Sequence, residues 1–102
     1  MIYRARTINL TRAKVAEAHA LIVKTATFVN EQFPGVTVEV LRNIGGPLNQ
    51  IHLITCCESL ATWEDYEEER QLNAGWLALI EEWRALDAEL STAVDHLYRS
   101  LI

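Results

Sequence analysis

The amino-acid sequence predicts an α+β fold in which a four-stranded antiparallel sheet carries helices on one face. Three observations predict it. Segments typical of strands and helices follow one another in the order strand, helix, strand, strand, helix, strand. A glycine turn joins the second and third strands, and the third strand is apolar on both sides. No Pro, Gly or Ser tract is long enough to separate two domains, so we expect residues 1–102 to form one domain.

The first strand and the first helix are predicted from the N-terminal third. Residues 2–10, "IYRARTINL", are rich in β-branched and aromatic side chains, which are typical of a strand. Thr11 can cap the helix that follows, and Pro34 and Gly35 end its pattern. Its apolar residues recur every three or four positions: Val15, Ala18, Ile22, Ala26, Val29 and Phe33. This spacing predicts an amphipathic helix of about six turns.

A hairpin is predicted next. In "VTVEVLRNI", residues 36–44, valines alternate with Thr37 and Glu39, which indicates a strand. Gly45, Gly46 and Pro47 supply turn chemistry, and residues 50–57 complete the hairpin. On this third strand, apolar residues occupy both sides: Ile51, Leu53 and Cys57 alternate with Ile54 and Cys56. We therefore expect both faces of the sheet to be covered, although one helix layer covers only one.

The second helical region is predicted to be broken in two. Ser59 is a candidate N-cap, and Trp63 and Tyr66 fall on the buried stripe of the helix that follows. Asn73 and Gly75 in "QLNAGW" are poor helix residues and predict a break. A further apolar stripe follows: Trp76, Leu79, Ile80, Trp83, Leu86 and Leu90.

The C-terminal segment is ambiguous from its residues. Trp76, Trp83, Leu90 and Leu97 are spaced by seven, so periodicity alone would continue a helix to the end. Against this, Ser91 and Thr92 interrupt the run, and "VDHLYRSLI" is an acceptable strand. The residues leave both alternatives open for 91–102.

A family resemblance favours the strand. The segments "ART", "GGPLNQIH", "ESLATWEDY" and "GWLALIEEW" make most of the chain resemble the NIPSNAP-type branch of the dimeric α/β-barrel superfamily. The resemblance implies a ferredoxin-like βαββαβ sheet, a C-terminal strand, and a homodimer in which two sheets pack face to face. Such a dimer would explain the strand with two apolar faces. We therefore expect the protein to be its own partner.

Composition argues against several classes of function. Nine basic and fourteen acidic residues give a formal charge of -5, which disfavours nucleic acid as a partner. No apolar run is long enough for a transmembrane helix, and "MIYRARTINLTRAK" has charges where the apolar part of a secretion signal would lie. We expect a cytoplasmic protein without a membrane partner. We also expect no cofactor, since no histidine stands out as a heme ligand.

The cysteines and histidines do not predict a metal site. Cys56 and Cys57 are adjacent in a strand, so their side chains point to opposite faces and cannot readily bind one ion. His52 and Cys56 share a face but are about 13 Å apart along the strand. We interpret both cysteines as small hydrophobic residues.

His52 and Arg6 are the candidates for chemistry. His52 shares a face with Ile54 and Cys56, where it could transfer protons or be a core histidine bonded to a neighbour. Arg4 and Arg6 lie on one side of the first strand, and Arg6 would suit a ligand carboxylate. The strand order implied by the fold places Arg6 within reach of His52, His96 and Tyr98. Arg6 could instead pair with Glu39 or be solvated.

Two functions follow from these residues. In the first, a homodimer binds a small apolar or carboxylate-bearing ligand in a cavity between sheet and helices, using Arg6, Trp63, Trp76 and Tyr98; the tryptophans could instead be core. In the second, a cofactor-independent monooxygenase or isomerase uses His52 as its base. The enzyme requires His52 to project into an enclosed cavity, which distinguishes the two.

Overall fold

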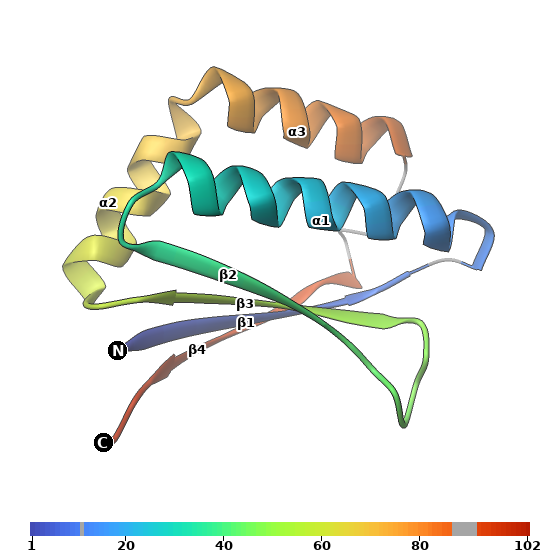
Figure 1. The fold of residues 1–102 in the computed structure, drawn as a ribbon, viewed down its shortest axis with the longest axis horizontal. Helices are drawn as coiled ribbons and strands as arrows, with labels where there is room; N and C mark the ends of the chain where they lie inside the picture. Colours follow the sequence, from blue (N-terminus) through green and yellow to red (C-terminus); the bar gives the residue numbers. More distant parts are fainter. Residues whose placement is uncertain (11, 87–91) are drawn as a thin grey trace.

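The computed structural model describes residues 1–10, 12–86 and 92–102, and its element order matches the predicted one (Figure 1). The elements are β1 (Ile2–Asn9), the short 3-10 helix η1 (Arg12–Lys14), α1 (Val15–Gln32), β2 (Val36–Arg42), β3 (Gln50–Cys57), α2 (Leu60–Gln71), α3 (Ala74–Leu86) and β4 (Val94–Arg99). The C-terminal segment therefore forms a strand, as the family resemblance implied.

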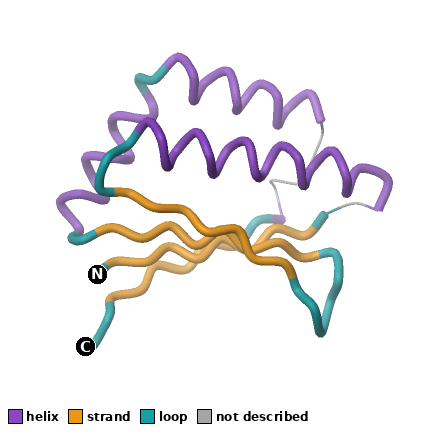
Figure 2. Tube along the Cα trace, in the orientation of Figure 1, coloured by secondary structure: helices purple, strands orange, loops and turns teal. Residues whose placement is uncertain are grey.

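The four strands form one antiparallel sheet in the order β2-β3-β1-β4, with β1 and β3 in the middle. All three α-helices lie on the same face of this sheet, with α1 and α3 side by side and α2 at one end (Figures 1 and 2). The two ends of the chain meet there as well, because the Ser100 amide donates to the Met1 carbonyl oxygen at 2.9 Å. This is the ferredoxin-like α+β arrangement that the sequence predicts.

Local signals account for the helix boundaries. The Ser59 hydroxyl accepts from the Thr62 amide at 3.2 Å, so the predicted N-cap of α2 is confirmed. Asn73 separates α2 from α3, and its side-chain oxygen accepts from the Trp76 amide at 3.0 Å. At the start of α1, Lys14 occupies the N-cap position without a side-chain cap, and Thr11 lies outside the described residues.

The hydrophobic core fills the space between the sheet and the helices. Its fully buried members come from β1, α1 and β3, with Ile8, Ile22 and Cys57 at 1% exposure or less. The helices pack closely on one another, since a Cβ at Gly75 would lie 2.7 Å from the ring of Phe28. In the same layer Trp83 donates to the Thr25 hydroxyl at 3.2 Å.

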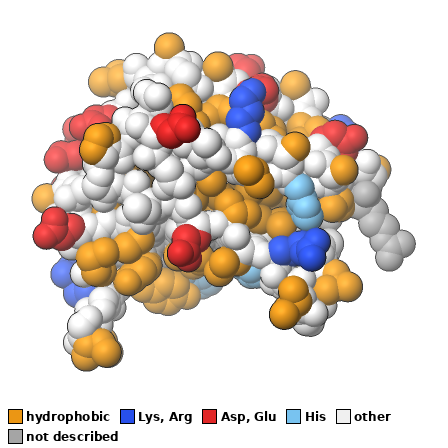
Figure 3. All heavy atoms as spheres, viewed as in Figure 1, with side chains coloured by type: hydrophobic (Ala, Val, Ile, Leu, Met, Phe, Trp, Pro, Cys, Tyr) orange, Lys and Arg blue, Asp and Glu red, His pale blue; other side chains and the backbone are white. Residues whose placement is uncertain are grey.

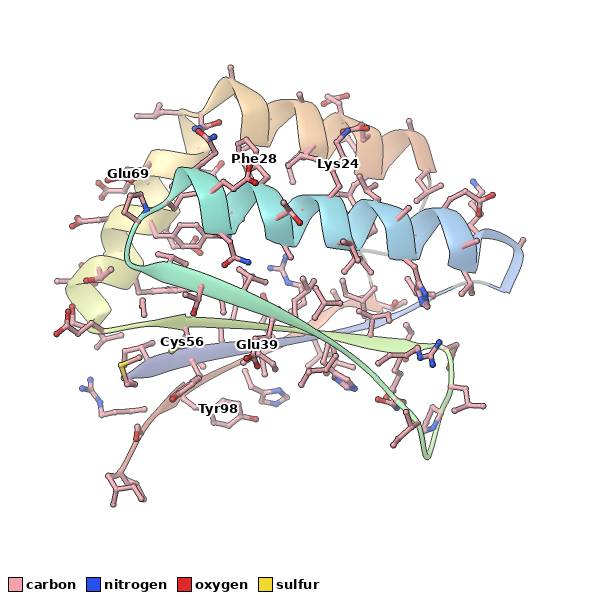
Figure 4. All side chains as sticks on the ribbon, viewed as in Figure 1. Lys24, Phe28, Glu39, Cys56, Glu69 and Tyr98 are labelled. Atoms are coloured by element: carbon pink, nitrogen blue, oxygen red, sulfur yellow. The ribbon has the colours of Figure 1, made fainter. Side chains whose placement is uncertain are left out.

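Among the residues that the structure describes, no helix covers the other face of the sheet. Figure 4 shows Glu39, Cys56 and Tyr98 on this side, directed away from the helix layer. Ile54 is half-buried there, and Tyr98 is 53% exposed. Hydrophobic atoms reach the surface along the lower edge of the molecule, beside histidine side chains (Figure 3). The single helix layer predicted from sequence is thus confirmed, and the second apolar side of β3 lies on the uncovered face.

Candidate functional site

A partly open cavity of about 60 Å³ lies between the sheet and the helices. Most of its wall is apolar and includes Ile8, Val29, Leu53, Ile80 and Trp83. Alone it is far smaller than the roughly 300 Å³ at which ligand pockets begin. A second hollow extends it.

That second hollow is a cleft of about 340 Å³ between β1, β4 and α2, more open to solvent than the cavity. Arg4 and Arg6 line both the cavity and the cleft, so these two side chains lie between the two spaces. Trp63, Glu67 and Arg70 form the side of the cleft that α2 contributes. The arrangement joins an apolar interior to a charged entrance.

Arg4 lies at the centre of this arrangement and is only 7% exposed. Its Nη2 donates to Thr55 Oγ1 at 3.2 Å, and its guanidinium carbon lies 5.4 Å from the ring centroid of Trp63. Its Nε is buried and has no hydrogen-bond partner among the described residues. Burial, with repulsion from Arg6 and Arg70, lowers the pKa of Arg4 to about 10, so the side chain stays protonated at neutral pH.

Arg70 reaches the same cleft from α2 and is also 7% exposed. It donates to the Tyr66 hydroxyl at 3.3 Å and to Glu67 Oε1 at 2.5 Å. Its guanidinium carbon lies 4.9 Å from the Tyr66 ring centroid and 5.1 Å from that of Trp76. Within the described part of the chain, its Nε also lacks a hydrogen-bond partner. Two buried guanidinium groups therefore lie in the wall of the same cleft, each packed against an aromatic ring. In each of them the described residues provide no hydrogen-bond partner for Nε.

Arg6 forms the outer part of the cluster and is paired with Asp95 of β4. Its Nε donates to Oδ1 at 2.7 Å and its Nη2 to Oδ2 at 2.8 Å, a bidentate ion pair. This hydrogen bonding holds the pKa of Asp95 below its ordinary value and raises that of Arg6. Arg6 therefore has a carboxylate partner within the chain.

The predicted ligand-binding residues divide between the two faces of the sheet. Trp63 lines the cleft and Trp76 the cavity, while Arg6 lines both. Tyr98 is instead on the uncovered face, where its ring stacks on His96 with centroids 6.1 Å apart. Tyr98 and the other three predicted residues thus do not form one site within a single chain.

His52 is also on the uncovered face and does not line the cavity. Its Nδ1 lies 2.9 Å from Thr7 Oγ1 and its Nε2 lies 2.6 Å from Asn43 Oδ1. The amide nitrogen of Asn43 donates to the Pro47 carbonyl oxygen, so Oδ1 faces the imidazole and accepts from Nε2. Nδ1 is then left to accept from the Thr7 hydroxyl. Both ring nitrogens are engaged, which is the arrangement of a bonded structural histidine.

The expected proximity of Arg6 and His52 is wrong. In the β1–β3 register Arg6 is opposite Leu53, whereas His52 is opposite Thr7. Neighbouring strand positions point to opposite faces, so a displacement of one residue places the two side chains on different sides of the sheet. Arg6 is not paired with Glu39 either, because Asp95 of the adjacent strand is its partner.

Sequence reasoning missed Arg70 and gave Arg4 no role. A signal for Arg70 was present: it is the only basic residue in "WEDYEEER" and stands four and seven residues after Tyr66 and Trp63. That spacing places it on the aromatic side of the helix rather than on the acidic one. For Arg4, the signal was its position two residues before Arg6 on the same side of β1.

The described residues contain no group of three or more His, Cys, Asp or Glu side chains able to hold a metal ion. Cys56 and Cys57 are both free thiols, and burial raises the pKa of Cys57. In the described ranges no helix combines the length and the apolar character that a membrane span requires.

Comparison with known proteins shows the fold. No protein-family model and no curated sequence matches the chain. An uncharacterized NIPSNAP domain protein from Burkholderia xenovorans is similar in structure, with a TM-score of 0.79 and 16% identity over 98% of this chain and 94% of the other. A NIPSNAP family protein of unknown function from Agrobacterium tumefaciens gives 0.77 and 19%, covering 98% and 87%.

An oxygenase shares the fold as well. A mutant form of SnoaB from Streptomyces nogalater, described as a cofactor-independent oxygenase, gives a TM-score of 0.73 and 19% identity over 99% of this chain and 93% of the other. At these identities the likeness is one of fold. The resemblance to NIPSNAP proteins inferred from sequence is confirmed at that level.

Proposed function

We propose that this protein is a homodimer that binds a small, largely apolar molecule between its sheet and its helices. The observation that carries the proposal is that an apolar cavity and a surface cleft lie on either side of the same two side chains, Arg4 and Arg6. A core volume without function would be filled by side chains, since protein interiors are packed to nearly crystalline density. The ligand body would lie in the cleft against Trp63 and extend toward the cavity.

Filling the cavity tests this function. Ala26 lines the cavity from α1, so Ala26→Leu should occupy most of the volume. We expect thermal-shift screening against small aromatic and aliphatic compounds to identify ligands of the wild type, and Ala26→Leu to bind them at least about tenfold more weakly. Ala16→Leu, at an exposed position of α1, is the matched control and should bind as the wild type does. Unchanged binding by a folded Ala26→Leu variant would contradict the proposal.

The dimer in this proposal uses the uncovered face of the sheet. Leu41, Val94 and Tyr98 are each about half exposed on it, and Ile54 lies between them on β3. A typical stable interface buries about 800 Å² per partner. Covering this face with a second sheet would remove its apolar side chains from water and complete the environment of β3.

Catalysis is the alternative, supported by the fold shared with a cofactor-independent oxygenase. In this version the chain is a monooxygenase or isomerase with His52 as its base. Because His52 does not line the cavity of the single chain, the reaction would take place on the uncovered face, in a space that a second subunit closes. Oxygen uptake, or isomer formation, is measured with a panel of phenols and aromatic ketones. His52→Ala should abolish turnover and leave the fold intact, as judged by circular dichroism. Full turnover by this variant would remove the catalytic role from His52.

A further inference from the structure

We infer that the ligand of the cleft is an aromatic carboxylate whose two oxygens lie between Arg4 and Arg70. This inference rests on the function proposed above and specifies the chemistry of the molecule bound. It uses a pair of residues to which neither the sequence analysis nor the structural relatives assign a role.

The charge of the cleft is unbalanced. Arg4, Arg6 and Arg70 line it together with two carboxylates, those of Glu67 and Asp95. Asp95 is bound to Arg6 and Glu67 to Arg70. Among the described residues, Arg4 forms no ion pair although it is more than nine-tenths buried. A buried charge is costly unless it is paired, so one negative charge is what the cleft lacks.

The unused hydrogen-bond donors agree with the charge. The Nε–H groups of Arg4 and Arg70 are both buried and both without partners in the described part of the chain. Their guanidinium groups are close enough for mutual repulsion to contribute to the lowered pKa of Arg4. Both side chains line the cleft, and a carboxylate offers two acceptor oxygens in one plane, one for each guanidinium group, with charge-assisted hydrogen bonds to both.

The surroundings specify the rest of the ligand. Trp63 lies against Arg4, while the rings of Tyr66 and Trp76 lie against Arg70. Beyond the arginines, the cavity wall is apolar. Of these three rings, that of Trp63 lines the cleft, and a flat aromatic body can contact it with offset stacking while its carboxylate meets the guanidinium groups. A small inorganic anion would use the donors but leave the aromatic wall of the cleft without contact.

Calorimetric titration of the 102-residue chain at neutral pH tests the inference with three probes. They are 2-naphthoate, the neutral isostere 2-naphthalenemethanol, and inorganic phosphate. We expect 2-naphthoate to bind at least about tenfold more tightly than either of the others, since hydrogen bonds to charged groups contribute at this level.

Three variants test which residues cause the tighter binding of 2-naphthoate. Arg4→Met and Arg70→Met should each weaken 2-naphthoate about tenfold or more and change 2-naphthalenemethanol by less than about threefold. Arg84→Met is the control, because Arg84 is exposed on α3 and pairs with Glu81 away from the cleft. It should leave all three titrations unchanged. If an arginine variant does not fold, the comparison of acid and alcohol on the wild type still decides the matter.

The outcomes separate this inference from the function on which it rests. Equal affinity for 2-naphthoate and 2-naphthalenemethanol would contradict a carboxylate site in the cleft. So would Arg4→Met and Arg70→Met variants that still prefer 2-naphthoate. Binding of the alcohol that Ala26→Leu abolishes would then still support a ligand cavity. If phosphate binds as tightly as 2-naphthoate, the cleft is an anion site that does not require an aromatic ligand, which would contradict the inference. No heat from either naphthalene probe at millimolar concentration would contradict both proposals.

Discussion

At the scale of single residues, Arg4 and Arg70 place two positive charges inside the molecule. Each is 7% exposed, and their neighbours supply aromatic faces and hydroxyl groups. Within the described ranges, Glu67 forms an ion pair with Arg70, and Arg4 forms none. Side chains of similar size without charge would be easier to bury. An arrangement that weakens the unliganded fold is typical of binding sites, where a ligand supplies the missing interaction.

Arg4→Met therefore should stabilise the protein in the absence of ligand. The substitution removes an unpaired buried charge and keeps an apolar side chain against Trp63, at the cost of the hydrogen bond to Thr55. We expect the free energy of unfolding in urea to rise by about 1 to 2 kcal/mol. A decrease of similar size would show that Arg4 is a structural residue rather than part of a binding site.

The Arg6–Asp95 pair predicts a local dependence on pH. Because the pKa of Asp95 lies below the ordinary 3.8 in the folded protein, the pair contributes stability above that pH. The contribution is lost as pH falls through the lowered folded-state pKa. The contribution to stability is small because the Asp95 side chain is 43% exposed.

An NMR titration of Asp95 tests this pair. Arg6→Met should raise the pKa of Asp95 toward 3.8, whereas Lys24→Met, which breaks the distant pair with Glu82, should leave it unchanged. If the pKa of Asp95 is the same in the wild type and in Arg6→Met, Arg6 is not the cause of the lowered pKa.

The residue scale is also where sequence prediction was weakest. Arg6, Trp63 and Trp76 line the cavity or the cleft, in keeping with the periodicity of their strand and helices, and their role in binding a ligand stays a prediction. The error over Arg6 and His52 came from the register, since one position of displacement exchanges the two faces of a sheet. Arg70 was missed because it stands in an acidic run that is typical of a solvated helix surface. Its burial depends on folded-state contacts, such as that with the Trp76 ring of α3.

At the scale of elements, α2 positions the site. It carries Trp63 and Arg70 on one side and begins at the Ser59 cap. Its C-terminal end is fixed by Asn73, which begins α3 in a new direction and allows Trp76 to meet Arg70. Capping and turn residues such as these are local signals, which is why the sequence predicted this boundary. The terminal strand was different, because its pairing with β1 is a long-range interaction that periodicity alone could not reveal.

Ser59→Ala tests the role of the cap. The substitution removes the acceptor for the Thr62 amide at the start of α2. We expect the free energy of unfolding to fall by about 1 kcal/mol, and Ser59→Asp, which keeps an acceptor, to stay close to the wild type. Equal stability of the alanine and serine proteins would indicate that the cap does not anchor this helix.

At the scale of the whole molecule, the two faces of the sheet differ in what covers them. The helix side holds the core and the site. The uncovered side carries Ile54, Cys56 and Tyr98, together with His52, whose bonds to Thr7 and Asn43 fix β1 and the end of β2 against β3. The sequence predicted the two apolar sides of β3. The described residues of one chain leave the second side uncovered, and the dimer proposed above would cover it.

A dimer through this face predicts a specific sensitivity to charge. Ile54 is central in the sheet, so Ile54→Glu should place a carboxylate inside the interface and produce monomers. We expect the wild type to sediment at twice the chain mass of 11.6 kDa at micromolar concentration. Val23→Glu, exposed on α1, should sediment as the wild type does. A wild-type monomer would contradict the dimer and leave the cleft of each chain unaffected.

The central claim is that Arg4 and Arg70 jointly hold a carboxylate, and the Nε–H signals of the arginines in proton–nitrogen NMR spectra test it most directly. On addition of 2-naphthoate, the signals of Arg4 and Arg70 should shift strongly and exchange more slowly with water, while that of Arg84 should not move. Titration with 2-naphthalenemethanol should leave all three in place. Saturating 2-naphthoate that leaves the Arg4 and Arg70 signals unmoved would contradict the account.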